Sequence, residues 1–158
     1  MPLRTNTFDL WVFSRARGEP RYLLFYASQE KADRYFNGGR FWQLVPGCLV
    51  RDGETLRGAL DRVLTGLRLD VVGVWAAEYT YTIYNLKRES VEVIPVFAAE
   101  VAAARGVPLP EGVSEQAWLS ASACEERLVF RGLKEGLRCV REYVSEVGEP
   151  HPALRLTG

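Results

Sequence analysis

Short runs of apolar and aromatic residues recur along this chain, several of them alternating with polar residues. Runs of this kind, bounded by glycine, proline or asparagine turns, predict β-strands. The predicted strands cover residues 7–14, 21–26, 41–50, 74–84, 90–101 and 116–119, with Pro46-Gly47 interrupting the third. Residues 16–20 and 85–89 are turn-like, so they join the strands on either side into hairpins.

Two other segments have the spacing of amphipathic helices. Residues 55–68 carry apolar side chains on one helical face, and residues 132–146 repeat the pattern. The apolar face of the first segment comprises Leu56, Leu60, Val63, Leu64 and Leu67. Ser28 is placed to cap a short helix, and Ser120 or Ser122 to cap another. The segment from about 148 onward contains two prolines and is predicted to be extended.

The order of these elements is strands, helix, strands, helix, with hairpins between strands. This order predicts an α/β (α+β) fold in which a mixed β-sheet is sandwiched between α-helices. The 158 residues fit one domain spanning 1–158. A composition of 47% hydrophobic and 25% charged residues is that of an ordinary globular protein.

The net charge and the hydropathy of the chain argue against nucleic acids and membranes as partners. The formal net charge is zero, which argues against nucleic acid as a partner, because such proteins usually carry a basic excess. No run approaches the roughly 20 apolar residues of a membrane span, and the N-terminus carries no cleavage signal, so we expect a cytoplasmic protein without a membrane partner. Aromatic residues in strands at both ends of the chain lead us to expect a homodimer.

Cysteine and histidine are too sparse for common metal or nucleophile sites. Cys48, Cys124 and Cys139 lie far apart, and His151 is the only histidine. The spacing suggests neither a zinc site nor a disulfide framework. His151 lies between two prolines near the end of the chain, where residues are usually loosely held.

One stretch carries a family resemblance. The residues concerned are Phe41-Trp42-Gln43-Leu44-Val45-Pro46-Gly47, Asp52-Gly53-Glu54-Thr55, Ala59 and Arg62. They resemble the Nudix (MutT-like) superfamily, whose box reads G-x5-E-x7-R-E-U-x-E-E-x-G-U with U a bulky aliphatic residue. Glu54 and Arg62 keep the separation of the box, and Leu64 fills its first aliphatic position. Over roughly residues 7–145 the chain is similar to deoxynucleoside and dihydroneopterin triphosphate pyrophosphohydrolases.

The departures from the box concern its metal ligands. The glutamates of the box fall on Val63, Gly66 and Leu67, which share one helical face. Magnesium prefers oxygen ligands, usually carboxylates, and these residues offer none. The box glycine falls on Gly47 or on Cys48, according to where one extra residue is placed. The resemblance implies that Glu54 and Arg62 brace the loop against the helix, with Gly47 and Gly53 as further remnants of the box. Because the metal ligands of the box are missing, we expect no bound metal or cofactor.

We therefore expect a catalytically impaired domain that binds a nucleotide or another small ligand, or has a regulatory role. The alternative is an active magnesium-dependent nucleoside-diphosphate-linked pyrophosphohydrolase that uses relocated acids. These acids would come from a set outside the helix face: Asp52, Asp61, Glu78, Glu89, Glu92, Glu115, Glu125 and Glu126. A second alternative is that residues 55–69 are an unrelated amphipathic helix.

The ligand pocket is expected among aromatic and polar residues near the box. The candidates are Arg40, Trp42, Gln43, Tyr79 and Tyr81. The aromatic side chains either stack on a planar ligand or belong to the core. Arg15, Arg40 and Lys87 either meet phosphate groups or are solvated.

Overall fold

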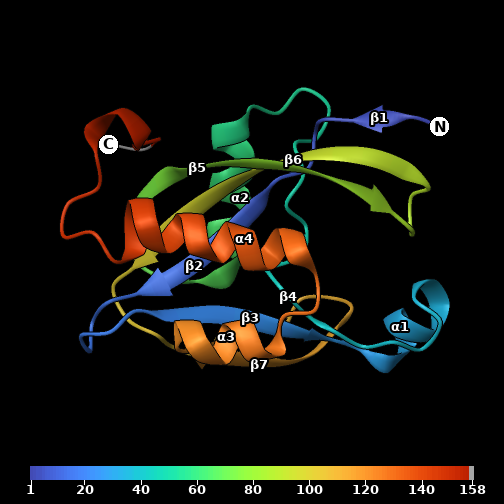
Figure 1. Cartoon of the computed structure of the whole chain (residues 1–158), viewed down its shortest axis with the longest axis horizontal. Helices are drawn as coiled ribbons and strands as arrows, with labels where there is room; N and C mark the ends of the chain where they lie inside the picture. The colour runs from blue at the N-terminus through green and yellow to red at the C-terminus, as the bar shows by residue number, and fades with distance from the viewer. Residues whose placement is uncertain (157–158) are drawn as a thin grey trace.

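The computed structural model of the chain describes residues 1–156, which fold around one seven-stranded sheet (Figure 1). The strands are β1 (Leu3–Arg4), β2 (Asp9–Ser14), β3 (Arg21–Ala27), β4 (Trp42–Gln43), β5 (Val71–Asn85), β6 (Ser90–Val101) and β7 (Val113–Leu119). The helices are α1 (Gln29–Tyr35), α2 (Leu56–Leu67), α3 (Ala121–Arg127) and α4 (Arg131–Val140). A π-helical turn, Arg141–Ser145, continues α4, and a 3-10 turn, Pro152–Leu154, lies near the end.

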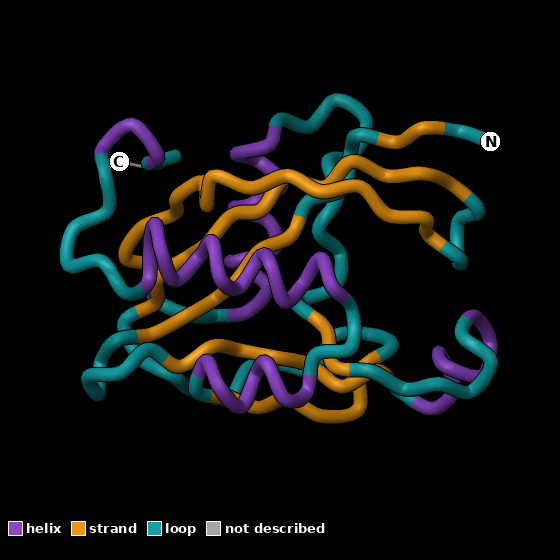
Figure 2. Tube along the Cα trace, viewed as in Figure 1, coloured by secondary structure: helices purple, strands orange, loops and turns teal. Residues whose placement is uncertain are grey.

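The sheet is mixed. Strand β6 runs parallel to both β1 and β2 and antiparallel to β5, while β3 runs antiparallel to β2, β4 and β7. Helices cover both of its faces (Figure 2). The predicted fold class is therefore confirmed. No helix among residues 1–156 is long and apolar enough to cross a membrane.

Helix α2 covers one face of the sheet because its apolar side chains are removed from water there. Leu60, Val63, Leu64 and Leu67 are buried in a cluster that includes inward-facing residues of β2, β3, β5 and β6. The helix begins after Thr55, whose hydroxyl accepts a hydrogen bond from the Gly58 amide at 3.0 Å. The predicted helix over 55–68 is thus confirmed.

Helices α3 and α4 cover the opposite face. Leu133, Leu137 and Val140 of α4 pack with Trp11, and with other side chains of β2, β3, β5 and β6. Together α4 and the π-helical turn confirm the predicted helix over 132–146. Ser28 and Ser120 cap α1 and α3 as predicted, because their hydroxyls accept hydrogen bonds from the backbone amides of Lys31 and Ala123.

Two predicted segments are wrong. Only Trp42–Gln43 of the strand predicted over 41–50 pairs as a strand, and Thr7 and Leu49 form an isolated bridge. Pro46, which has no amide hydrogen to donate to a ladder, lies between them. The segment from 148 is not simply extended: residues 152–154 form a 3-10 turn, and the Leu156 amide donates to the Val74 carbonyl at 2.8 Å. Residues 157–158 of this segment lie outside the described residues.

Strand β5 contains a bulge opposite a proline. Its pairing with β6 shifts between Ala76 and Thr80, which face Phe97 and Pro95. Proline cannot donate a ladder hydrogen bond, so a bulge is one of the few places where a central strand tolerates it. Within the bulge Glu78 takes a positive φ of 58°. Tyr79, within the shifted segment, and Tyr81, just after it, both pack on the α4 side of the sheet.

Candidate functional site

The remnant of the box forms a clamp between the loop and α2. Arg62 donates from Nε and Nη2 to the two carboxylate oxygens of Glu54, each at 3.0 Å. The same guanidinium donates to the Leu49 carbonyl at 2.7 Å and to the Gly47 carbonyl at 3.4 Å. Glu54 also accepts a hydrogen bond from the Arg51 amide at 3.1 Å. A paired guanidinium and carboxylate of this kind fix the loop geometrically as well as electrostatically.

This clamp predicts a pH effect on the acid side. Hydrogen bonds from Arg62, and then from the Arg51 amide, lower the pKa of Glu54 from 4.5 to about 2. An acid whose pKa is lower in the folded state than in the unfolded one stabilises the fold above pH 4.5, and this contribution is lost as the pH falls towards 2. Glu54→Gln should therefore flatten the decline in stability between pH 5 and pH 3, measured as the midpoint of thermal unfolding. An equally steep decline in the variant would contradict this assignment.

The three positions on which the resemblance places the metal ligands of the box offer no side-chain oxygen to a cation. Val63 is 8% exposed and Leu67 is 3% exposed, both within the apolar cluster under α2. Gly66 is exposed, and a Cβ built on it would meet no atom within 4 Å. Magnesium, which the resemblance implies, does not fit these residues, because none of them has a side-chain oxygen.

The acids elsewhere in the described chain are not gathered into a cluster of metal ligands. Across residues 1–156, no group of three or more His, Cys, Asp or Glu side chains is arranged to hold a metal ion. Glu92 is fully buried but its carboxylate is already occupied: it accepts hydrogen bonds from Thr7 at 2.6 Å and from Asn85, and lies 3.7 Å from Arg88. These contacts tie the start of β2 to the β5–β6 hairpin.

Some of the predicted ligand residues have structural roles, and others lie together on one face of the sheet. Arg40 donates to the Ala27 carbonyl at 2.8 Å and to the Ser114 hydroxyl, and its guanidinium lies 4.1 Å from the centre of the Tyr26 ring. It therefore fastens the segment before β4 to β3 and β7. Arg15 is also structural, since it pairs with Glu100 at 2.9 Å.

Trp42, Tyr79 and Tyr81 all border the apolar cluster on the α3 and α4 side of the sheet. Trp42 stacks on Tyr26 with ring centres 4.9 Å apart, and the Arg127 guanidinium lies 5.7 Å from the Trp42 ring. Tyr79 and Tyr81 stack on each other at 5.7 Å. The three side chains are only partly buried, so they combine core packing with an accessible aromatic surface.

Gln43 lies against a lysine that the sequence did not single out. Its side-chain carbonyl oxygen accepts a hydrogen bond from Lys31 Nζ at 3.0 Å, while its amide nitrogen is buried without a partner among the described residues. The reverse orientation of the amide would point two donors at an ammonium group, so the lysine fixes the orientation shown.

Asp9 is a second residue that sequence reasoning missed. Its carboxylate accepts a hydrogen bond from the Tyr81 hydroxyl, and burial raises its pKa to about 6 against the opposing effect of that bond. The Tyr81 ring is packed so tightly on α4 that a Cβ at Gly132 would lie 2.1 Å from its Cε2 atom. The available signal was a lone acid within an apolar strand, but its partner is remote in sequence.

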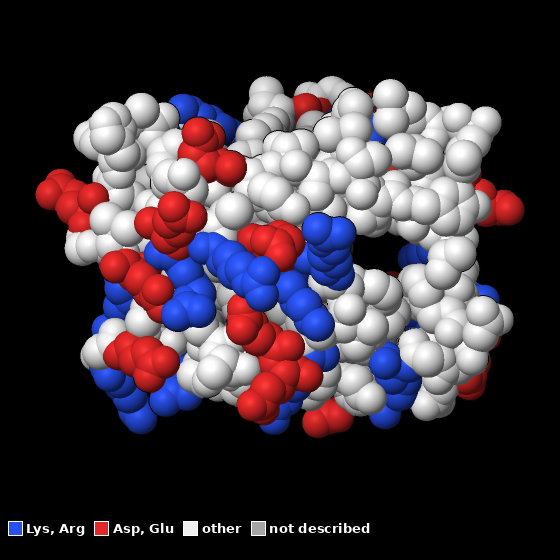
Figure 3. Space-filling model, in the orientation of Figure 1, with Lys and Arg blue, Asp and Glu red and all other residues white. Residues whose placement is uncertain are grey.

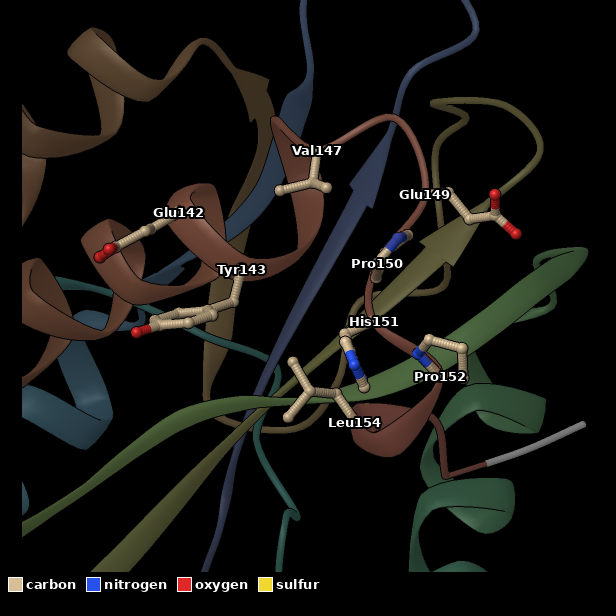
Figure 4. A pocket seen from close by; sticks show the side chains of 8 residues that line it. All are labelled: Glu142, Tyr143, Val147, Glu149, Pro150, His151, Pro152 and Leu154. Atoms are coloured by element: carbon tan, nitrogen blue, oxygen red, sulfur yellow. The ribbon is translucent and has the colours of Figure 1, made fainter.

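Two hollows lie outside the aromatic cluster. One of about 480 Å³ lies between the π-helical turn and the C-terminal segment, where Tyr143, His151 and Leu154 line it (Figure 4). It contains none of the box residues. The other, of about 330 Å³, lies between α1 and the turn joining β5 to β6, and includes Pro46 from the box loop. The second hollow therefore borders the loop that Arg62 holds, through Pro46.

Comparisons with known proteins rest on structure. No family model matches the chain, and no curated protein matches it in sequence. A Nudix hydrolase from M. smegmatis superposes with a TM-score of 0.65 and 16% identity, covering 96% of this chain and 92% of its own.

Two further structures are similar to the chain. The dihydroneopterin triphosphate pyrophosphohydrolase of E. coli gives a TM-score of 0.60 at 15% identity, over 89% of this chain and 99% of its own. The Nudix domain of Shewanella oneidensis NrtR, complexed with ADP ribose, gives 0.61 at 17% identity, over 90% of this chain and 87% of its own. The resemblance seen in the sequence therefore extends to the whole architecture, and the chain has the Nudix fold.

Proposed function

We propose that this protein is a catalytically impaired Nudix domain that binds a nucleotide-like small molecule. The observation that carries the proposal is the burial of Val63 and Leu67 in an apolar cluster at positions where the box has metal-binding glutamates. Hydrolysis of a pyrophosphate bond by this fold would need divalent cations to neutralise phosphate charge and activate water. Without carboxylates at this face, the chain retains the scaffold of the site but lacks the ligands for the metal.

Retention of the clamp supports a binding role. Glu54 and Arg62 still hold the loop against α2, and the partly exposed rings of Trp42, Tyr79 and Tyr81 offer surfaces on which a base can stack. The NrtR Nudix domain, of the same fold, was solved in complex with ADP ribose. The homodimer and the cytoplasmic location expected from the sequence remain predictions.

The test is a hydrolysis assay paired with a binding assay. Nucleoside di- and triphosphates, ADP-ribose and dihydroneopterin triphosphate are incubated with magnesium or manganese, and released phosphate and pyrophosphate are measured. We expect no release above the protein-free control, while calorimetry in EDTA detects binding of at least one of these compounds. Turnover at ordinary enzyme rates, on the order of 1 per second or more, would overturn the proposal and direct attention to acids outside α2.

A further inference from the structure

The hollow between α1 and the β5–β6 turn is lined by an unusual set of charges. Its cations are Lys31 and Arg34 of α1 and Lys87 of the turn, and its acids are Glu30 and Glu111. In Figure 3 the surface is hollowed between α1 and the β5–β6 hairpin, and basic atoms are visible inside the hollow. The two segments that carry the lysines are far apart in the sequence and meet only through the fold.

Lys31 has a neutral partner. Its ammonium group donates to Gln43 Oε1 at 3.0 Å and lies 6.0 Å from the centre of the Phe41 ring. No carboxylate lies within 4.0 Å of it among the described residues. Its pKa is lowered, first by burial and then by the charge of Lys87. A half-buried ammonium without an ion pair is a costly arrangement that a bound anion would relieve.

Lys87 lines the same hollow from the turn that joins β5 to β6. Its ammonium group lies 4.7 Å from the centre of the Tyr35 ring, which supplies a cation–π contact but no counter-charge. Among residues 1–156 it also has no carboxylate partner within 4.0 Å. The repulsion between the two lysines is therefore left without compensation inside the hollow.

The acids at the hollow do not neutralise these lysines. Glu30 pairs with Arg34 at 3.6 Å, and both of these side chains are largely exposed. Glu111 forms no ion pair within 4.0 Å among the described residues. The positive charge that an anion would meet on entering is that of Lys31 and Lys87.

We propose that Lys31 and Lys87 together bind the diphosphate group of a ligand in this hollow without a metal ion. The inference rests on the proposed function and names the part of the ligand that the domain recognises. A diphosphate has two linked anionic groups, and both lysines line one hollow of about 330 Å³, Lys31 from α1 and Lys87 from the β5–β6 turn. Pro46 lines the same hollow directly before Gly47, whose carbonyl accepts from Arg62, so the site borders the clamped loop. The lysines supply the positive charge that metal ions supply in a hydrolase.

Calorimetry in EDTA tests this with two probes, inorganic pyrophosphate and ADP, which separate a free diphosphate from a nucleoside diphosphate. We expect wild-type protein to bind one or both, with affinity falling as salt is raised. Lys31→Gln and Lys87→Gln should each weaken binding by about tenfold or more, as expected for loss of a charged hydrogen-bond donor. Lys87→Arg should retain most of the affinity, because it keeps the charge.

The chain offers a matched control, because Lys134 on α4 is the only other lysine and does not line the hollow. Lys134→Gln should leave the affinity for both probes unchanged. Circular dichroism verifies the fold of every variant, and Lys87, on an exposed turn, is expected to tolerate replacement.

The possible failures are distinguishable. Binding of neither probe, or binding that the Lys31 and Lys87 variants leave unaltered, overturns the diphosphate site. In the second case the domain still binds a nucleotide, so the proposed function stands. Magnesium-dependent hydrolysis of ADP at enzymatic rates overturns the proposed function itself, and a strict requirement for magnesium in binding overturns both.

Discussion

Leu67→Glu is expected to lower the free energy of unfolding by about 3–5 kcal/mol. Leu67 is 3% exposed and packs in the apolar cluster between α2 and the sheet. The replacement removes buried apolar contacts and places a carboxylate where no cation is present to pair with it. Urea denaturation at pH 7 measures this loss of stability. Part of the stability should return at low pH, where the introduced glutamate is neutral.

Gly66→Glu is the matched control, one position earlier on the same helix. A Cβ at Gly66 meets no atom within 4 Å, and the residue is exposed. Since glycine is unfavourable in a helix interior, this variant should be unchanged or more stable by up to about 1 kcal/mol. Equal stability of the two variants would show that the face at 67 is open, which would remove the main support for the proposed function.

The contrast bears on attempts to restore activity. Introducing Val63→Glu, Gly66→Glu and Leu67→Glu together supplies the three carboxylates of the box, but two of them enter the apolar cluster. If the proposed function holds, apolar packing by Val63 and Leu67 occupies the face where the box would hold its metal. Restoration would need the neighbouring core to be opened as well as the acids to be returned.

The sequence pattern correctly predicted the helices, hairpins and caps that depend on residues close together in the chain. The stripe over 55–68, the hairpin of β2 and β3, and the caps at Ser28 and Ser120 each depend on neighbouring residues, and the structure contains all of them. The strand over 41–50 failed because its apolar residues pack into the core from a loop: Leu44 and Val45 are buried without belonging to a strand. A loop whose apolar side chains are buried therefore has the same sequence pattern as a strand.

The candidate site was less predictable because its contacts join remote segments. Asp9 meets Tyr81 only through the pairing of β2, β6 and β5, and Lys31 meets Lys87 only because α1 lies beside the hairpin turn. The spacing of apolar residues along the chain does not reveal contacts between residues that are remote in sequence. The Glu54–Arg62 clamp was predictable because the resemblance to the Nudix box assigns both residues to the contact between the loop and the helix.

The two perturbed carboxyl groups act on stability in opposite directions. The pKa of Glu54 is lowered to about 2, so its contribution is complete above pH 4.5. The pKa of Asp9 is raised to about 6 from 3.8, so the folded state holds a proton that the unfolded state has released between these values. The free energy of unfolding should therefore fall as the pH increases from about 4 to 6, the range between the two pKa values of Asp9.

Asp9→Asn should abolish this fall and stabilise the protein at pH 7. The amide keeps an acceptor for the Tyr81 hydroxyl while removing a charge that burial disfavours. A pKa shift of about two units corresponds to about 3 kcal/mol, which sets the upper size of the gain at pH 7. At pH 4 and below, where wild-type Asp9 is protonated when folded, the two proteins should be nearly equal in stability.

The measurement is urea denaturation of both proteins at intervals between pH 4 and pH 7. Tyr81→Phe provides the opposing control: it removes the one hydrogen bond that favours the Asp9 carboxylate, so it should raise the pKa of Asp9 further and destabilise the fold at pH 7. A wild-type profile that is flat across this range would show that the pKa of Asp9 is not raised on folding. An asparagine variant that is less stable at pH 7 would show that the folded state stabilises the Asp9 carboxylate. Asp9 would then need a cationic partner or solvent that its burial beside Tyr81 does not provide.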